Sequence, residues 1–308
     1  MKNRIVRVGT RGSQLALKQT GDVIARLRTL HPGIEIETAI IKTSGDADQE
    51  SSLEKIGGFG LFTKKIEAEL LSGTIDIAVH SAKDLPSVMT DGLAIGAVPP
   101  REDNRDAWLS GDGSGLNDIK PGALVGTGSP RRRAQILNLR PDLKTTDLRG
   151  NIDTRLRKLS DGVVDIILMA AAGLKRLELD DNITEYLPPE SFIPAPGQGA
   201  LVVQVRSDDD DIPKLTDPLS HDESRHCLII ERLLLEKLGA GCSAAVGGWA
   251  RYEKNNIRLS AVVLDKNGRE RLYKEACIEI GGDYSDLVEP VVSGLIDMGA
   301  QKLMAENE

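Results

Sequence analysis

Three kinds of side chain in this sequence could do chemistry: a loop carboxylate, a group of arginines and a cysteine beside glycines. Asp84 comes shortly after the apolar run Ile75–Val79, in a loop with His80 and Ser81. A carboxylate at the end of a buried strand can act as a general acid or stabilise a cation. Since Asp84-Leu85-Pro86 is also typical of a turn, the loop alone favours a capping role, and both interpretations stay open.

Basic residues gather in the middle of the chain, close to predicted helix starts. Between Lys120 and Arg176 there are 12 basic and five acidic residues, a net charge of +7 in a chain of net charge −8. Helix N-termini present free N–H groups, and a guanidinium binds a carboxylate through two parallel hydrogen bonds. These basic residues could bind a ligand with several anionic groups, or they could form a solvated helix face. The charge alone favours neither interpretation. The candidate anion-binding residues are Arg11, Ser13, Thr127, Ser129, Arg131, Arg132, Arg149 and Arg155.

Cys242 ends the segment Gly-Ala-Gly-Cys that follows a long predicted helix. Glycines let a ligand approach the backbone, and an exposed thiol there could be a nucleophile or an attachment point. A lone cysteine is more often a small buried hydrophobic residue, the role that we assign to Cys227 and Cys277. No two of the three cysteines form a C-x-x-C pair, so the sequence predicts no metal site and no disulfide framework and fits a reducing compartment.

Composition narrows the classes of protein that the chain can belong to. The 308 residues predict two or three domains, and 40% hydrophobic with 28% charged residues excludes wholesale disorder. The longest apolar run, Ile166–Leu174, is about half of a membrane span. The N-terminal segment MKNRIVRVGTRGS has no apolar stretch, so we expect no secretory signal and a cytoplasmic protein.

Strands alternate with helices in two stretches of the chain that echo each other. The segment from Val8 to Ser13 (VGTRGS) is similar to that from Val125 to Ser129 (VGTGS). Both place polar residues just beyond a strand, where open α/β sheets bind ligands. We therefore expect an α/β fold of two similar doubly wound lobes that face a cleft, as in type II periplasmic binding proteins, with a small α+β C-terminal domain.

Proline-rich crossings and a change of composition set the expected domain boundaries. Pro99-Pro100 and the prolines from Pro188 to Pro196 mark the crossings between the lobes. The last domain is expected to contain two strands, joined at Asn267-Gly268, and one final helix over 284–303. The expected domains are 1–99 with 198–218, the basic segment 100–197, and 219–308 with Cys242.

Several motifs follow one another in an order that is too specific to arise by chance. They are Lys55-Ile-Gly-Gly-Phe-Gly-Leu-Phe62, Asp76-Ile-Ala-Val-His-Ser-Ala-Lys-Asp-Leu-Pro86, Arg101-Glu-Asp103, Val125-Gly-Thr-Gly-Ser129, Leu148-Arg-Gly-Asn151, Ala172-Gly-Leu-Lys-Arg-Leu177 and Pro196-Gly-Gln-Gly199. With them the chain resembles the porphobilinogen deaminases, or hydroxymethylbilane synthases. The resemblance implies a transferase that joins porphobilinogen units head to tail into hydroxymethylbilane and releases ammonia. It also implies a dipyrromethane cofactor, held by a thioether to Cys242, and no metal.

The resemblance implies a role for each matching residue. Asp84 matches the catalytic carboxylate, which stabilises positive charge on the pyrrole nitrogens. The cofactor-binding positions match Ser81, Lys83, Thr127, Ser129, Arg131, Arg132, Arg149, Gly150 and Cys242. The substrate-binding positions match Arg11, Ser13, Arg149, Arg155, Arg176 and Gln198. Phe59 stands where many relatives have a lysine.

Partners follow from the resemblance, and two other functions remain as alternatives. The substrate would be porphobilinogen, the product would pass to uroporphyrinogen-III synthase, and the chain would act as a monomer, without nucleic acid or membrane. A solute-binding protein would share the two-lobed fold, but such proteins usually carry a secretory signal. A nucleic-acid binder could use Arg131-Arg132-Arg133, but the charge of −8 and 3% aromatic residues disfavour it.

Overall fold

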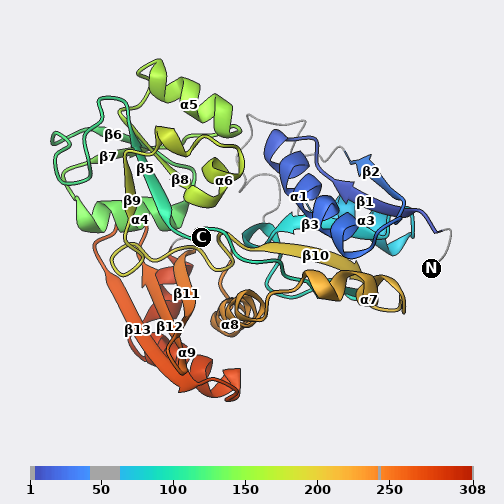
Figure 1. The fold of residues 1–308 in the computed structure, drawn as a ribbon. Coiled ribbons are helices and arrows are strands. Elements are labelled where there is room, and N and C mark those ends of the chain that lie inside the picture. The colour runs from blue at the N-terminus through green and yellow to red at the C-terminus, as the bar shows by residue number, and fades with distance from the viewer. Residues whose placement is uncertain (1–3, 42–62, 242–243, 307–308) are drawn as a thin grey trace. The chain divides into compact units, whose positions relative to one another are not determined.

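The computed structural model describes residues 4–41, 63–241 and 244–306 (Figure 1). By their packing, the residues divide into two compact units. One unit contains Met1–Glu102 and Gly199–His226, and the other contains Asp103–Gln198 and Cys227–Glu308. Within the described ranges, no helix is both long enough and apolar enough to cross a membrane.

The first unit is built on a mixed sheet of five strands. Across the sheet these are β2 (Ile36–Ile40), β1 (Val6–Thr10), β3 (Ile77–Ser81), β10 (Leu201–Arg206) and β4 (Leu93–Ala97). β1 is parallel to β2 and β3, whereas β10 is antiparallel to both of its neighbours. Helices α1 (Gln14–Leu30) and α7 (Ile212–Thr216) pack on one face and α3 (Lys64–Leu71) on the other.

The second unit contains another mixed sheet of five strands. Across this sheet they are β7 (Lys144–Thr146), β6 (Leu124–Gly126), β8 (Ile166–Ala170), β5 (Asp106–Ser110) and β9 (Glu185–Leu187). Helix α4 (Pro130–Leu139) packs on one face, and α5 (Ile152–Ser160) with α6 (Ala171–Arg176) on the other. Successive residues of β8 face the two cores in turn, which explains the long apolar run as a buried strand followed by α6.

Both sheets have the same pattern of strand directions, although the inserted antiparallel strand comes last along the chain in the first sheet and first in the second. In each sheet, the first three strands from the β2 or β7 edge are parallel to one another. The fourth strand, β10 or β5, is antiparallel to both of its neighbours. In the first unit the inserted strand is β10, so Leu201–Val205 returns to the first sheet as predicted. The two similar doubly wound lobes that the repeated V-G-T segments predicted are therefore confirmed.

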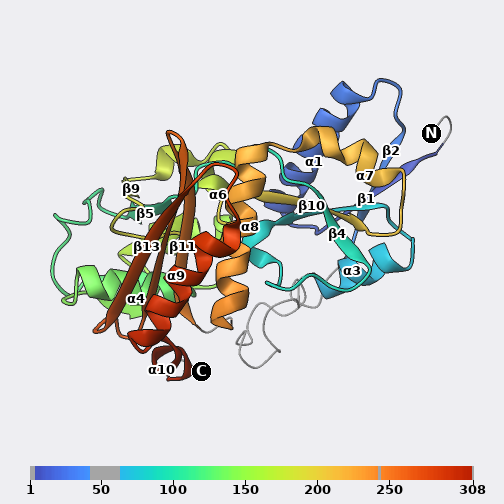
Figure 2. The same cartoon turned by 90° about the horizontal axis from the view of Figure 1, so that it is seen from below.

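A third, smaller sheet belongs to the C-terminal part of the chain (Figure 2). The sheet consists of the antiparallel strands β11 (Ala245–Glu253), β12 (Asn256–Leu264) and β13 (Arg271–Glu279). Helix α8 (Asp222–Leu238) precedes these strands in the chain, and helices α9 (Tyr284–Asp297) and α10 (Ala300–Ala305) follow them. Apolar residues of α8 and α9 share one core with β12. The predicted small α+β domain is thus present.

Two expectations for this region were wrong. Strand β11 was not expected, because its first half contains Gly247-Gly248 in place of strand-forming residues. The single final helix is instead two helices, because Gly299 between them has a φ of +100°. A residue with that backbone conformation ends an α-helix.

The third sheet packs against the second sheet's helix α4 within one unit. Ala134 and Ile193 share a small core with Ala245 and Val262, and the Asn138 side chain donates a hydrogen bond to the Gly268 carbonyl at 2.8 Å. Because the described chain packs as two units, the division into three domains (1–99 with 198–218, 100–197 and 219–308) stays a prediction.

Candidate active site

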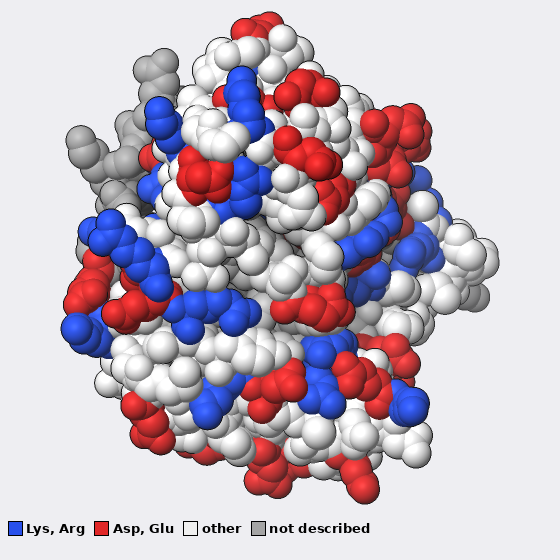
Figure 3. Space-filling model, turned by 90° about the vertical axis from the view of Figure 1, so that its left-hand side faces the viewer, with Lys and Arg blue, Asp and Glu red and all other residues white. Residues whose placement is uncertain are grey.

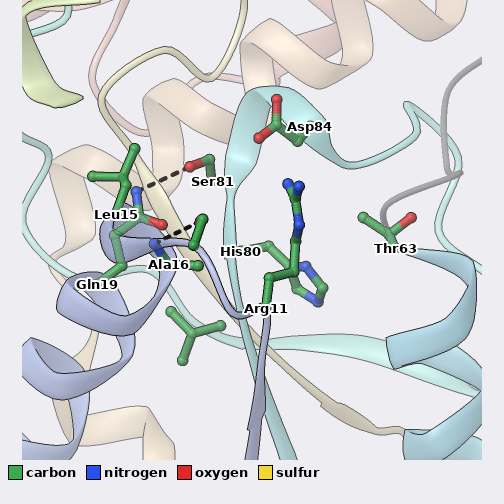
Figure 4. A pocket seen from close by; sticks show the side chains of 10 residues that line it. Arg11, Leu15, Ala16, Gln19, Thr63, His80, Ser81 and Asp84 are labelled. Carbon is green, nitrogen blue, oxygen red and sulfur yellow. Dashed lines mark hydrogen bonds between the residues drawn. The ribbon is translucent and has the colours of Figure 1, made fainter. Parts of the chain in front are cut away.

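Asp84 lies in a pocket of the first unit, at the ends of neighbouring parallel strands (Figure 4). Because β1 and β3 run parallel and are hydrogen-bonded, the loops that follow them meet at one edge of the sheet. The pocket is lined by Arg11, Ser13, Leu15, Ala16, Gln19, Thr63, Val79, His80, Ser81 and Asp84. The Arg11 guanidinium points toward the side of the pocket where Asp84 lies (Figure 4).

Asp84 is presented by a single 3₁₀ turn, Ala82–Asp84, directly after β3. The Ala82 N–H donates to the Ala200 carbonyl at 3.0 Å, which ties the turn to β10. The Asp84 side chain is exposed, and Asp84 is the last residue of the turn, whose N-cap position is Ser81. An exposed carboxylate in the lining of a pocket can reach a ligand, and the catalytic role of Asp84 stays a prediction.

Ser13 and Gln19 shape the opposite wall of the pocket. Ser13 caps α1 by accepting a hydrogen bond from the Ala16 N–H at 3.3 Å. Gln19 is buried, and its Nε2 donates to the Ser81 hydroxyl at 3.0 Å. Sequence reasoning missed Gln19, although a polar residue on the buried face of an amphipathic helix was a usable signal.

His80 forms a buried, uncharged part of the pocket. Burial lowers the pKa of its imidazole to about 4; the neighbouring Gln204 side chain opposes the shift, and the nearby Arg11 charge adds to it. At neutral pH the imidazole is therefore uncharged. The positive charge that this pocket offers to an anion comes from Arg11.

The second unit brings a basic cluster together at an equivalent edge of its own sheet. The loops after β6 and β7 carry Thr127, Ser129, Arg149 and Gly150, and these strands are parallel neighbours. Ser129 caps α4 by accepting from the Arg132 N–H at 3.4 Å, and the Thr127 hydroxyl accepts from the Ser129 N–H at 3.2 Å. Pro130 occupies the first turn of α4.

Arg131 and Arg132 are buried beside one carboxylate, that of Asp106. Asp106 Oδ1 accepts from Arg132 Nε at 2.6 Å and from Arg131 Nη2 at 3.1 Å. Burial raises the pKa of the Asp106 carboxyl, but the charges of Arg131 and then Arg132 outweigh it and lower the pKa to about 2. Sequence reasoning missed Asp106, although a carboxylate beginning an otherwise apolar strand signals a buried ion pair.

Arg155 adds a third guanidinium to this cluster. Its Nε donates to the Gly150 carbonyl at 2.9 Å, and in the part of the chain that the structure describes no carboxylate pairs with it. Burial lowers the pKa of Arg155 to about 10, and the charges of Arg132 and Arg149 add to the shift. The cluster therefore concentrates positive charge that a polyanionic ligand can neutralise.

The remaining predicted site residues have different surroundings. Gln198 is fully buried, its Oε1 accepts from Arg132 Nη2 at 3.2 Å, and its Nε2 donates to the Asn104 carbonyl at 2.8 Å. Lys83 lies in the 3₁₀ turn beside Asp84, and Arg176 is the last residue of α6; both are partly buried. Cys242 and Phe59 lie outside the described residues.

Neither nucleic-acid nor metal binding gains support from the described residues. Arg131 and Arg132 are 4% and 6% exposed, so they do not form the basic surface that a nucleic-acid backbone requires. On the face drawn in Figure 3, basic and acidic side chains are interspersed. Among residues 4–41, 63–241 and 244–306, no group of three or more His, Cys, Asp or Glu side chains could hold a metal ion.

Comparison with known proteins identifies the family. A family model described as "Porphobilinogen deaminase, dipyromethane cofactor binding domain" matches residues 6–214, and one described as "Porphobilinogen deaminase, C-terminal domain" matches residues 225–293. The chain belongs to the porphobilinogen deaminase family. The resemblance inferred from the motifs is thereby confirmed.

Curated relatives match the chain over its full length. It is 43% identical over 307 residues to a porphobilinogen deaminase of Syntrophobacter fumaroxidans, covering 99% of both chains. It is 46% identical to the Thermus thermophilus porphobilinogen deaminase, covering 98% of this chain and 99% of that one. Among solved structures, the VFT2 domain of Bordetella pertussis BvgS aligns with 72% of this chain and 91% of its own, at 13% identity and a TM-score of 0.44. Likeness at that level says nothing about function.

The basic cluster fits the dipyrromethane for which the porphobilinogen deaminase cofactor-binding domain is named. Each pyrrole of this group carries an acetate and a propionate, so the group offers four carboxylates. Arg131, Arg132, Arg149 and Arg155 provide four guanidiniums at one sheet edge, beside the N-terminus of α4. The donors are therefore opposite in charge to the carboxylates of the ligand and can donate hydrogen bonds to them.

Proposed function

We propose that this chain condenses porphobilinogen units head to tail into hydroxymethylbilane and releases one ammonia for each unit. The observation that carries the proposal is Asp84 in a pocket with Arg11, in a chain that porphobilinogen deaminases match from end to end. The activity is that of a transferase, as the family implies. The lining of this pocket includes the carboxylate of Asp84 and the guanidinium of Arg11.

Asp84 and Arg11 have complementary tasks in this proposal. The exposed Asp84 carboxylate stabilises positive charge on a pyrrole nitrogen as ammonia leaves and the next bond forms. Arg11 binds a substrate carboxylate, aided by Ser13 at the N-terminus of α1, where the helix dipole favours an anion. Arg149, Arg155, Arg176 and Gln198 are the further substrate-binding residues that we propose.

The chain's own residues would hold the cofactor through charge and one covalent bond. When bound, the dipyrromethane supplies the primer on which the pyrrole chain grows. We propose that the Cys242 thiolate forms a carbon–sulfur bond to the aminomethyl carbon of a porphobilinogen unit, whose carbon–nitrogen bond breaks as ammonia leaves. The carboxylates of the dipyrromethane would be bound by Ser81, Lys83, Thr127, Ser129, Arg131, Arg132, Arg149 and Gly150.

Substitution of Asp84 tests the function directly. With purified chain and porphobilinogen, we expect consumption of substrate with an equal amount of ammonia released. Asp84→Asn keeps the shape of the side chain and removes its charge, so the rate should fall at least 100-fold. The matched control is Asp91→Asn, an exposed loop aspartate of the same unit that does not line the pocket, and it should keep the parent rate. A parent rate in Asp84→Asn would contradict the catalytic role.

Assembly, location and the fate of the product belong to the same proposal. We propose a monomer in the cytoplasm that passes hydroxymethylbilane to uroporphyrinogen-III synthase. A monomer predicts a mass near 33.2 kDa by light scattering of the eluted protein. A mass of twice that value would contradict it. If transfer occurs, adding the synthase to the reaction should convert the product into the cyclic tetrapyrrole, and failure to do so would contradict transfer.

A further inference from the structure

Among the described residues, Asp106 is the only carboxylate that forms an ion pair with Arg131 or Arg132 of α4. It begins β5 and is completely buried. Its Oδ2 lies 2.8 Å from Arg131 Nη1, and its Oδ1 accepts from both Arg131 Nη2 and Arg132 Nε. One carboxylate thus contacts two consecutive arginines on the first turn of a helix.

Other groups complete a fixed frame around these two guanidiniums. Arg131 Nη1 donates to the Ile193 carbonyl at 2.7 Å, and Arg132 Nη1 donates to the Leu168 carbonyl at 3.3 Å. Arg132 Nη2 donates to Gln198 Oε1 at 3.2 Å. Each arginine is therefore held on Asp106 and on at least one neighbouring segment, which leaves little rotamer freedom.

Positive charge exceeds negative charge around Asp106. Two adjacent buried cations repel each other, and the nearby Arg155 adds to the repulsion. A single buried carboxylate offsets part of it, which allows the two arginines to lie side by side before any ligand arrives. It does not neutralise them both, so positive charge remains for an anion.

We propose that Asp106 is a positioning residue for the cofactor, which holds Arg131 and Arg132 in their ligand-binding orientation before the dipyrromethane binds. Asp106 does not contact the cofactor in this proposal and acts through the two guanidiniums. A fixed site avoids the cost of ordering two long side chains when the ligand binds. The inference rests on the proposed function, because it assumes that these arginines bind that group.

The first test measures cofactor loading in a variant. Apo-protein with Asp106→Asn is mixed with porphobilinogen, and intact mass follows the appearance of the adduct. We expect loading at least tenfold slower than in the parent, from protein with a cooperative unfolding transition. The matched control is Asp142→Asn, an exposed aspartate that pairs with Arg140 at the other end of α4, and it should load like the parent. Loading of folded Asp106→Asn at the parent rate would overturn the proposal.

The second test does not depend on whether that variant folds. Cys242→Ser protein, which the proposed function predicts cannot load, keeps Asp106 intact. Nitrogen-15 relaxation of the Arg132 Nε–H should show a rigid guanidinium in this empty protein, and a mobile one would overturn the proposal. The two hypotheses fail differently. A parent that never loads contradicts the proposed function. If the parent loads and the Asp106→Asn variant loads equally well, only this inference is contradicted.

Discussion

At the residue scale, the candidate site depends on cations kept close together in partly buried surroundings. Arg155 shows this most clearly, because burial and two neighbouring arginines lower its pKa while its Nε is held by the Gly150 carbonyl. Gly150 can present that carbonyl because its φ is +111°, a conformation that favours glycine. The Leu148-Arg-Gly-Asn151 motif thus has a local physical reason for its glycine.

Gly150→Ala should therefore destabilise the protein and impair cofactor loading together. A Cβ at this position would lie 2.7 Å from Thr154 Cγ2 and 2.8 Å from Thr154 Cβ, in addition to the backbone strain. The control is Gly162→Ala, which has a φ of +70° and open space, so it should cost only about 1–2 kcal/mol of unfolding free energy. Urea unfolding measures both variants, and an equal loss in the two would contradict the close contact with Thr154.

His80 gives the protein a pH-dependent component of stability. Its folded-state pKa of about 4 is below the ordinary value of 6.5, so the unfolded chain binds the proton more strongly between these two pH values. The free energy of unfolding should therefore fall by about 3 kcal/mol from this residue as the pH drops from 6.5 to 4. For His80→Gln, the fall in the free energy of unfolding over the same pH range should be smaller by that amount. Identical pH dependence of urea unfolding in the two proteins would contradict a buried neutral imidazole.

At the element scale, α4 is the helix on which the basic cluster depends. Its start was predictable, since Ser129 followed by Pro130 is a helix-start signal. Its packing was not predictable, because Gln135 binds both backbone groups of Ile193, which is distant in sequence. Gln135 Nε2 donates to the Ile193 carbonyl at 2.9 Å, and Gln135 Oε1 accepts from its N–H at 2.8 Å.

Gln135→Leu should be clearly more destabilising than Asn138→Ala on the same helix. The first variant leaves the buried Ile193 N–H unsatisfied, whereas the Ile193 carbonyl keeps its hydrogen bond from Arg131 Nη1. It should cost about 2–4 kcal/mol, because an unsatisfied buried group costs about 1–3 kcal/mol and the second lost hydrogen bond about 1 kcal/mol. The second removes one partly buried hydrogen bond to Gly268 and should cost about 1 kcal/mol. Thermal and urea unfolding distinguish them, and equal losses would contradict the clamp on Ile193.

The sequence predicted the repeated strand–helix units well, because periodicity and helix caps are local signals. It failed at β11, where two consecutive glycines disguise a strand that is stabilised by pairing with β12. It also failed to separate α9 from α10, because one glycine inside an amphipathic pattern does not by itself reveal a positive φ. Local patterns could have marked Asp106 and Gln19 as buried polar residues, but their partners Arg132 and Ser81 are distant in sequence, and no local pattern specifies them.

At the scale of the whole molecule, the number of cooperative units is the main structural question. The sequence predicts three domains, whereas helix α4 and the third sheet share a core in the second unit. The two tryptophans report on the two parts of that unit, since Trp108 lies in β5 and Trp249 in β11.

We expect both parts of the second unit to unfold together. With 5-fluorotryptophan in the unchanged chain, fluorine NMR resolves the two indoles, and their folded resonances should disappear at the same urea concentration. Separate midpoints would contradict the shared core and favour independent domains over 100–197 and 219–308.

The central claim, a porphobilinogen deaminase with its cofactor on Cys242, is tested most directly by intact mass. The parent chain should carry the added mass of one dipyrromethane, and Cys242→Ser should carry none. Cys277→Ser, which changes an exposed cysteine on β13, should keep the adduct. A parent that stays unmodified after porphobilinogen is added, and that does not consume it, would contradict the account and leave an anion-binding protein as the better interpretation.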